Sequence, residues 1–315
     1  MKIEFLTLEK YLELRLNPSS AFGSADFLRL NAYKADNVIC AVGDGKVGIV
    51  FGKTDGELRA PWSAPYMSVD RAPHADSAEL FREFGDSLRS VLDDNIAIRL
   101  VTPPKIHGRY EEHFLKGFRR EGDKLISDTS FYIDLRDSEG EKRWNKSAKR
   151  NLRRANNEGI EAFITSDFRE CYDLIASHHV ALGYNMAMTA EQVYDTSRII
   201  PVDFWVVKKN DELLAAMYCY RVRNDIVQVI SSGDTPNGRK MGAGMFMERA
   251  IIDHYRKLLV EKEGIINAIL DHGPTSVNGI QNEGLASFKS SFGCKMTPKT
   301  TLISSGESVD NSGDL

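Results

Sequence analysis

Short apolar runs separated by polar turns organise the first part of the chain. The runs over 37–41 and 47–51 flank Gly43-Asp44-Gly45, and a third run, over 57–60, follows the turn signal Asp55-Gly56. Such runs around glycine turns predict an antiparallel meander. The apolar spacing further along predicts helices over 75–92 and 110–115 and strands over 96–101 and 130–135. This part is therefore predicted to form a mixed α/β unit.

The second part of the chain repeats this order with better definition. The pattern predicts a strand over 160–164, helices over 168–182 and 190–199, and then three strands with polar turns at 209–212 and 223–225. A glycine-containing segment follows, and then a helix over 245–259, a strand over 265–270, a helix over 282–292 and a last strand over 299–303. Two successive units with the same element order suggest a duplicated fold.

The length of 315 residues also favours two domains, because one domain takes roughly 100–200 residues. We place the domains at 1–138 and 139–303, and we expect the Ser-, Gly-, Asp- and Asn-rich tail over 304–315 to be disordered. A basic helix is predicted over 142–155, with Lys142, Arg143, Lys146, Lys149, Arg150, Arg153 and Arg154. It is either a patch for an anionic ligand or a solvated linker helix.

Charge and targeting signals exclude several classes of protein. The formal net charge of -4 gives no reason to expect DNA or an acidic membrane as a partner. No apolar stretch approaches the roughly 20 residues that span a bilayer, and the N-terminus lacks a signal-peptide pattern. We therefore expect a cytoplasmic protein without membrane insertion. Cys40, Cys171, Cys219 and Cys294 are far apart and are expected to be reduced, and no cluster predicts a metal site.

The segment Arg239-Lys240-Met241-Gly242-Ala243-Gly244 lies between a strand-like run over 226–232 and the helix-like run over 245–259. Its glycines allow close approach of the backbone to a ligand, and the following helix points unpaired N–H groups at an anion. The alternative is a plain helix N-terminus after a glycine-rich turn. The segment matches neither the G-x-x-x-x-G-K-[ST] loop nor G-x-G-x-x-G. We predict a backbone cradle for a phosphate or pyrophosphate.

This segment has the form R/Q-x-x-G-x-G/A, which resembles the coenzyme A loop of the GNAT superfamily of N-acyltransferases. The element order of the second part is also that of a GNAT domain. The segment over 282–293, NEGLASFKSSFG, is similar to the closing N-x-G-L-x-x-F-K-x-x-F-G of the Fem-type branch, which has two such domains. The resemblance implies an α+β fold of two tandem GNAT-like domains, each a mostly antiparallel sheet flanked by helices.

The resemblance also implies roles for individual residues. The residues expected to bind the donor, acetyl-CoA or another acyl-CoA, are Ile230, Ser231, Arg239, Lys240, Met241, Gly242, Ala243, Gly244 and Asn282. Lys289 stands where many GNAT enzymes have a tyrosine, and the Fem-type branch implicates a lysine there in acyl transfer. Its ammonium could stabilise the carbonyl oxygen or protonate the leaving group. Otherwise Lys289 is an exposed residue of an amphipathic helix.

The proton acceptor is left open by the sequence. Asp271 and His272 follow the strand predicted over 265–270, where α/β sites open, or else they are turn and capping residues. His178 and His179 are interpreted as surface or core histidines. A serine hydrolase is not favoured, because Ser231 lacks a G-x-S-x-G elbow and no histidine is placed to suggest a partner.

The predicted function is transfer of an acyl group from acyl-CoA to an amine of a small acceptor. Resemblance to the Fem-type branch favours a cell-envelope precursor as acceptor, either a nucleotide-linked amino sugar or a peptide. The first domain has no glycine over 67–74 and is expected to be a scaffold and one wall of an acceptor cleft. One alternative is a Fem-type transferase that uses aminoacyl-tRNA, which the basic helix favours. The other is a non-catalytic GNAT-like binding module.

Overall fold

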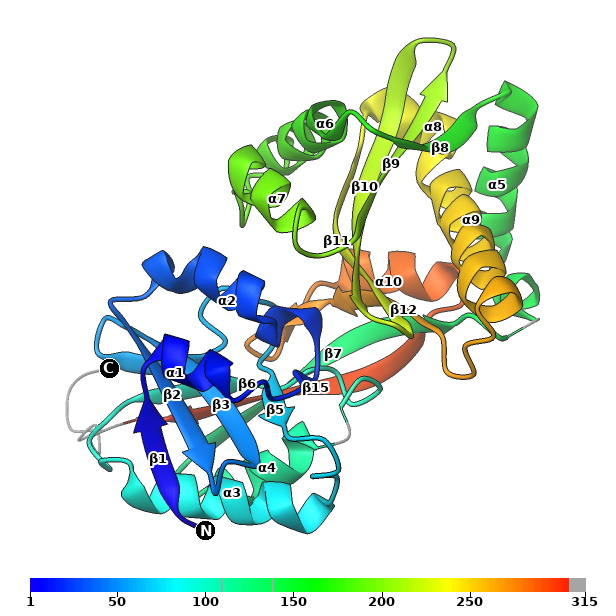
Figure 1. Cartoon of the computed structure of the whole chain (residues 1–315). Helices are drawn as coiled ribbons and strands as arrows, with labels where there is room; N and C mark the ends of the chain where they lie inside the picture. Colours follow the sequence, from blue (N-terminus) through cyan, green and yellow to red (C-terminus); the bar gives the residue numbers. More distant parts are fainter. Residues whose placement is uncertain (109, 138, 306–315) are drawn as a thin grey trace, which may run out of the picture. The chain divides into compact units, whose positions relative to one another are not determined.

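The computed structural model describes residues 1–108, 110–137 and 139–305, and the chain forms two compact units (Figure 1). The first unit comprises Met1–Thr129, Ser276–Ile280 and residues 297–305, and the second comprises Ser130–Thr275 and Gln281–Met296. Most of the last strand, assigned by the sequence to the domain over 139–303, lies in the first unit. Ser304 ends that strand, and residues 306–315 of the predicted disordered tail lie outside the described residues.

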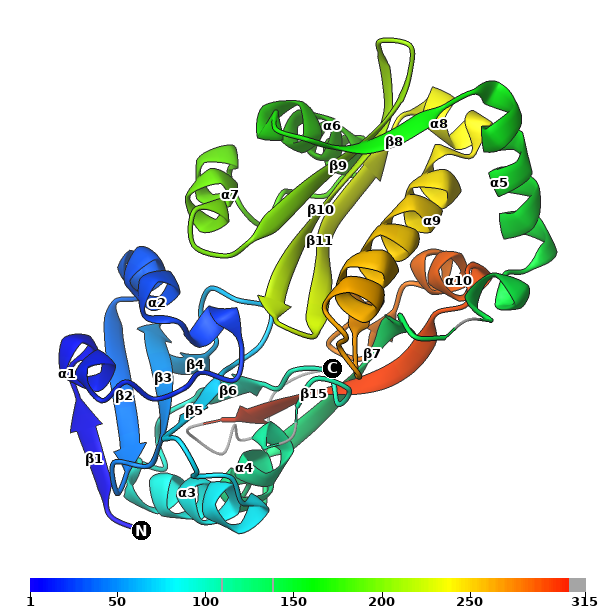
Figure 2. The same ribbon diagram turned by 45° about the vertical axis from the view of Figure 1, so that its right-hand side comes forward.

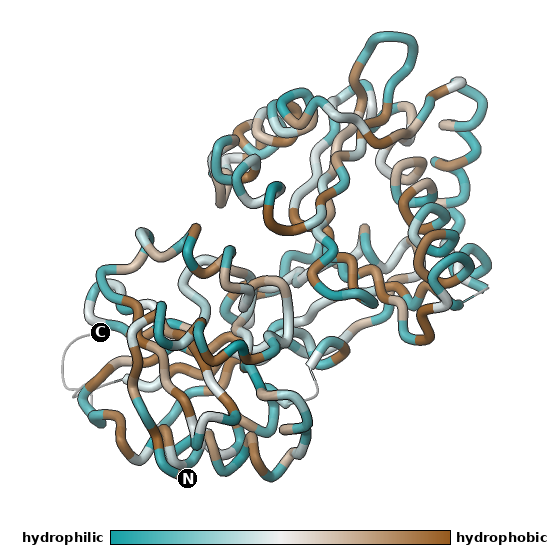
Figure 3. The backbone as a smooth tube through the Cα atoms, in the orientation of Figure 1, coloured by the Kyte–Doolittle hydropathy of each residue, from teal (hydrophilic) through white to brown (hydrophobic). Residues whose placement is uncertain are grey.

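The sheet of the first unit confirms the predicted meander. Its strands, in spatial order, are β1 (Ile3–Leu6), β2 (Asn37–Gly43), β3 (Val47–Thr54), β4 (Glu57–Ala60), β6 (Ile98–Val101) and β15 (Lys295–Ser304). Neighbours are antiparallel except for β4 and β6, and β5 (Val69–Arg71) pairs with β3. Figure 3 shows hydrophobic positions concentrated along these strands.

Two packed helices cover the core of this sheet. The helices of the first unit are α1 (Leu8–Glu13), α2 (Ala25–Asn31), α3 (Ala78–Val91) and α4 (Glu111–Phe118), with 3-10 turns at Ala21–Gly23 and Ala32–Lys34. A Cβ on Gly85 would lie 2.2 Å from the Phe114 carbonyl oxygen, so this glycine allows α3 and α4 to touch. The contact places Phe81, Phe84 and Phe114 in the core, all fully buried.

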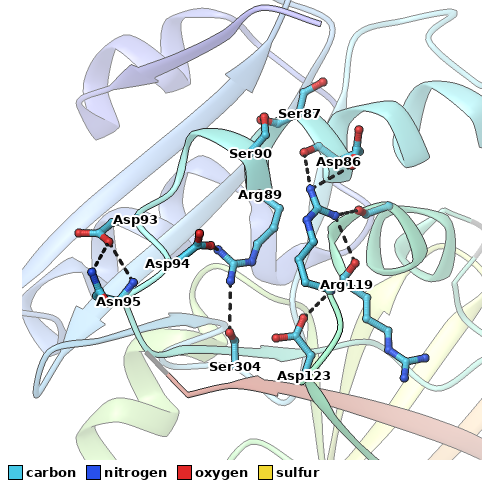
Figure 4. Close-up of polar contacts among 12 residues, drawn as sticks. Asp86, Ser87, Arg89, Ser90, Asp93, Asp94, Asn95, Arg119, Asp123 and Ser304 are labelled. Atoms are coloured by element: carbon cyan, nitrogen blue, oxygen red, sulfur yellow. Dashed lines mark hydrogen bonds and ion pairs between the residues drawn. The ribbon is translucent and has the colours of Figure 1, made fainter. Parts of the chain in front are cut away.

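Polar contacts hold the end of β15 in the first unit (Figure 4). The Arg89 guanidinium donates to the Ser304 hydroxyl at 3.5 Å and forms an ion pair with Asp94 at 3.0 Å. Nearby, the Thr102 hydroxyl donates to the Thr300 carbonyl at 3.0 Å. The C-terminal strand is therefore part of the first unit's sheet, which its position in the sequence does not indicate.

Among the described residues of the second unit, β11 and β12 pair in parallel and the other neighbouring strands are antiparallel. In spatial order the strands of its sheet are β7 (Lys124–Asp134, in this unit from Ser130 on), β12 (Ile269–Pro274), β11 (Ile226–Asp234), β10 (Glu212–Arg223), β9 (Val202–Lys209) and β8 (Glu161–Thr165). The short strands β13 (Ser276–Val277) and β14 (Ile280–Gln281) pair separately. The predicted strand over 265–270 begins later than expected, because 265–268 form the approach to β12.

Helices cover both faces of this sheet, as Figure 2 shows. They are α5 (Lys146–Glu158), α6 (Phe168–Ala181), α7 (Ala190–Ser197), α8 (Pro236–Met241), α9 (Ala243–Tyr255) and α10 (Glu283–Ser291), with a 3-10 turn at Gly140–Arg143 and a π-helical segment at Arg256–Lys262. Helix α6 packs on β9, β10 and β11, and α9 packs on β8, β9 and β10. The predicted fold class, mostly antiparallel sheets flanked by helices, is confirmed. No helix in the described residues combines the length and apolar character needed to cross a membrane.

Candidate functional site

Strand β11 separates from its parallel neighbour after a short paired stretch. The pairs are Ile226 with Ile269, Val227 with Leu270, and Gln228 with Asp271, whereas β11 continues to Asp234. On its other edge β11 stays paired with β10, and the register shifts between the Val229 and Ser231 pairs. Ile230 is therefore the extra residue of a bulge. A bulge bends its strand and increases its twist, so the paired β11–β12 stretch ends beside this residue.

The segment over 239–244 is not a loop. It consists of the last turn of a helix and a glycine junction at Gly242–Gly244, called the hinge below. Arg239, Lys240 and Met241 belong to α8, so this part of the segment is helical and not the loop that the sequence predicted. The physical reason lies just upstream. The Thr235 side chain accepts a hydrogen bond from the Gly238 N–H at 2.9 Å, and Pro236 begins the helix, which is a favourable start for a helix.

Helix α9 begins within this hinge without a side-chain cap. Gly242, with φ of 83°, ends α8 and precedes Ala243. Ala243, Gly244 and Met245 form the first turn of α9. Their N–H groups therefore have no acceptor within the helix. A Cβ on Gly242 would lie 2.4 Å from the Asn151 carbonyl oxygen, whereas one on Gly244 would have only a Phe288 ring carbon near it, at 4.0 Å. Gly244 is therefore the glycine with open space beside it.

The basic helix α5 lies against α8 and α9. The Arg154 guanidinium donates to the Lys240 carbonyl at 2.6 Å. Lys146, Arg150 and Arg153 of the same helix are exposed. Helix α5 therefore places at least the Arg154 cation next to the N-terminal end of α9, where the helix dipole also favours an anion.

Lys289 is buried rather than exposed. Its side chain is only 7% accessible, and its ammonium donates to the backbone carbonyls of His272, Gly273 and Pro274 at 2.6, 3.1 and 3.2 Å. Burial lowers the pKa of Lys289 to about 8. Asn282 caps α10, because its side chain accepts from the Leu285 N–H at 3.0 Å. The amide oxygen of Asn282 thus already has a structural partner.

Asp271 and His272 lie inside β12 and not after it, which corrects their predicted position at an open strand end. The strand extends to Pro274 because its second edge pairs with β7 as far as Ser130. Both residues are buried, and Asp271 accepts from the Gly273 N–H at 2.8 Å. Burial lowers the pKa of His272 to about 3, so its imidazole is neutral.

Glu248 completes this buried polar cluster and was missed by the sequence analysis. Its carboxylate lies 3.7 Å from the His272 Nε2 atom, and burial raises the pKa of Glu248 to about 8. The sequence did contain a signal for it. Glu248 is at helical spacing from the apolar residues Met245 and Ile252, so this acid falls on the apolar face of α9. In the part of the chain that the structure describes, no three His, Cys, Asp or Glu side chains are grouped as a metal site requires.

The expectation that no histidine lies near Ser231 is wrong. The Nε2 atom of His179 lies 3.3 Å from the Ser231 hydroxyl oxygen. Its neighbour His178 lies 3.3 Å from an Asp234 carboxylate oxygen. Both histidines are on α6, which packs on β11, so their approach to Ser231 depends on a tertiary contact that local sequence patterns do not reveal.

The solved structures that resemble this chain agree on the fold. Neither protein-family models nor curated proteins match the sequence. Among solved structures, FemX aligns with a TM-score of 0.62 at 11% identity, covering 96% of this chain and 97% of its own. L-PGS from Bacillus licheniformis gives 0.56 at 13%, covering 96% and 92%. A tandem GNAT protein from the clavulanic acid biosynthesis pathway gives 0.50 at 11%, covering 98% and 100%. The chain therefore has a tandem GNAT-like, Fem-type fold, as the sequence predicted.

Proposed function

We propose that the protein is an N-acyltransferase that transfers the acyl group of an acyl-CoA to an amine of a small acceptor. The observation that carries the proposal is the separation of β11 from β12 at the Ile230 bulge, in the same unit as the uncapped N-terminus of α9. The first feature leaves part of one edge of β11 without a strand partner among the described residues, and an extended ligand can lie along such an edge. The second offers N–H donors to a phosphate. An acyl-CoA has both parts, a long amide-containing arm and a pyrophosphate.

The residues around the α9 N-terminus fit the pyrophosphate. The open side of Gly244 admits a ligand close to the backbone, and the exposed cations of α5 add positive charge. Arg239, whose guanidinium lies 3.4 Å from Asp234, is half exposed at the same end of the sheet. Of the residues expected from the sequence, Gly242 to Gly244 therefore stay in the proposed binding site. The groups proposed to contact the pyrophosphate are the backbone amides of α9.

In this proposal Lys289 acts as a buried positive charge. An ammonium has three N–H donors, and three backbone carbonyls accept from this one. No donor is left for a substrate oxygen in this arrangement. Lys289 therefore fixes the end of β12 and supplies a field that stabilises negative charge on the thioester oxygen. Asp271, His272 and Glu248 lie near Lys289, and their protonation states determine the net charge of this buried cluster.

A second donor, aminoacyl-tRNA, is favoured by one specific observation. Lys146, Arg150 and Arg153 are exposed at helical spacing on α5 and form no ion pair with any described residue. Such a row of cations suits a nucleic-acid backbone better than one pyrophosphate. The cell-envelope acceptor, a nucleotide-linked amino sugar or a peptide, is proposed with either donor. The first unit is proposed as the scaffold and acceptor-side domain.

Titration calorimetry of the full-length protein distinguishes the two donors. Acetyl-CoA and longer acyl-CoAs are titrated in parallel with charged and uncharged tRNA. Gly244→Asp is expected to abolish binding of acyl-CoA, because it places a carboxylate beside the phosphates, whereas the matched Gly244→Ala variant should retain most of it. Absence of binding by every acyl-CoA would reject the first donor. Selective retention of charged tRNA would establish the second.

A further inference from the structure

A serine and a histidine from distant parts of the sequence meet one residue after the β11 bulge. The Ser231 hydroxyl and the His179 Nε2 atom are 3.3 Å apart, and both side chains are half-buried. A hydroxyl within hydrogen-bond reach of an imidazole is the arrangement that proton transfer needs. We propose that Ser231 and His179 form a proton-transfer pair that accepts the proton released by the attacking amine. This inference rests on the proposed acyltransferase function.

The position of the pair is fixed by backbone packing. Ser231 is the cross-strand partner of Tyr218, and Gly233 follows two residues later on the same face of β11. A Cβ on Gly233 would lie 2.8 Å from the His178 Cβ and 3.0 Å from the Ile175 Cα, so the glycine brings α6 directly onto the strand. His179 is thus held over Ser231 by a helix and a strand and not by a loop.

The charged neighbours of the pair are already engaged with one another. Asp234 lies 3.3 Å from the His178 ring and 3.4 Å from the Arg239 guanidinium. The charged or titratable groups near this end of the strand include His178 on α6, Asp234 on β11 and Arg239 on α8, and the Tyr218 phenol of β10 lies across from Ser231. Burial, and to a lesser degree the neighbouring His178, lower the pKa of His179. The His179 imidazole is therefore neutral at pH 7 and able to take up a proton.

The step balances without a further reactant. The amine nitrogen bonds to the thioester carbonyl carbon, and its proton moves to the Ser231 oxygen as the Ser231 proton moves to His179 Nε2. The carbon–sulfur bond then breaks, and the imidazolium returns the proton to the leaving thiolate. The products are an amide and a free thiol, and the pair regains its starting state.

The kinetic test uses the full-length protein with acetyl-CoA as donor and a panel of primary amines, and it follows thiol release. His179→Gln and Ser231→Ala should lower kcat about 100-fold while the Kd for acetyl-CoA stays unchanged. Ser231→Thr keeps the hydroxyl and should recover activity to within a few-fold. The control is His74→Gln, at an exposed position of the first unit. Full turnover by His179→Gln would overturn the proposal, as would a loss explained entirely by weaker acetyl-CoA binding.

A second test, the pKa of His179 measured by NMR, does not require enzymatic activity. In ¹⁵N-histidine NMR spectra, with the His179 signals assigned from the His179→Gln variant, Ser231→Ala should raise the pKa of His179. The reason is that, in the proposed pair, the serine hydroxyl donates to the neutral ring and stabilises it. An unchanged pKa would overturn the pair. If acetyl-CoA does not bind but the upward shift is observed, the acyl-CoA donor is rejected and the pair is kept.

Discussion

The backbone carbonyl oxygen of Asn151 lies against Gly242 so closely that a Cβ at this glycine would be 2.4 Å from it. Because Asn151 is in the middle of α5 and Gly242 joins α8 to α9, three helices meet at one residue without a side chain. The positive φ of 83° is a second reason for glycine here. The basic helix is therefore docked at the hinge by backbone contact.

Gly242→Ala should destabilise the protein by about 2 kcal/mol or more, because a left-handed alanine alone costs roughly 1–2 kcal/mol and the carbonyl contact adds to it. Urea unfolding measures the loss. Gly244→Ala is the matched control, and its free energy of unfolding should change little, because the space beside Gly244 is open. Equal stability of the two variants would contradict the packing described at Gly242.

Charge reversal on α5 should weaken binding of the anionic donor. Arg150→Glu is expected to raise the Kd for acetyl-CoA several-fold at low salt, with a smaller effect at high salt because exposed charges are screened. The control is Lys257→Glu, an exposed change of the same sign beyond the far end of α9. Calorimetry at two ionic strengths gives the comparison, and equal effects of the two variants would exclude a local role for α5.

Lys289→Met should destabilise the second unit by about 3 kcal/mol, because it leaves three buried backbone carbonyls without their donor. An exposed control, Lys257→Met, should stay within about 0.5 kcal/mol of the parent protein. Urea unfolding at one pH is sufficient. A loss of turnover in Lys289→Met can be assigned to chemistry only under conditions where the variant remains folded.

The buried carboxyl of Glu248 should make stability depend on pH. Its pKa is raised from 4.5 to about 8 on folding, so the native state binds more protons than the unfolded state and stability falls as pH rises through this range. His272 has the opposite effect, but only between about 3 and 6.5. From pH 6.5 to 8 the parent protein should therefore lose stability relative to Glu248→Gln, by at most about 1.4 kcal/mol per pH unit. Parallel unfolding free energies for the two proteins would show that Glu248 does not titrate as described.

The sequence predicted elements where periodicity was long and turns were explicit. The helices α3, α6, α9 and α10 and the strands β9 to β11 follow their patterns closely. The helices α1 and α2 have six and seven residues, which is too short for a 3.6-residue period to stand out. The sheet membership of β15 is decided by pairing with β6, and no local pattern contains that information.

In the candidate site, too, some features could be predicted from the sequence and others could not. Lys289, Asp271 and His272 could be selected from motif and order, but their burial could not, because it depends on how α10 packs against β12. Arg239 to Met241 lie between Gly238 and Gly242, which indicate a turn, yet the Thr235 cap and Pro236 begin a helix there. The contact between Ser231 and His179 joins residues 52 positions apart, and only the tertiary fold places them together.

The Ile230 bulge has a consequence for the behaviour of the protein in solution. Beyond Gln228, the edge of β11 that faced β12 has no strand partner among the described residues, although the backbone of Asp234 is hydrogen-bonded to the His178 ring. An open strand edge is a template on which a strand from another molecule can pair. Under the proposed function an acyl-CoA would lie along this edge, so we expect added acyl-CoA to reduce aggregation of the protein at high concentration.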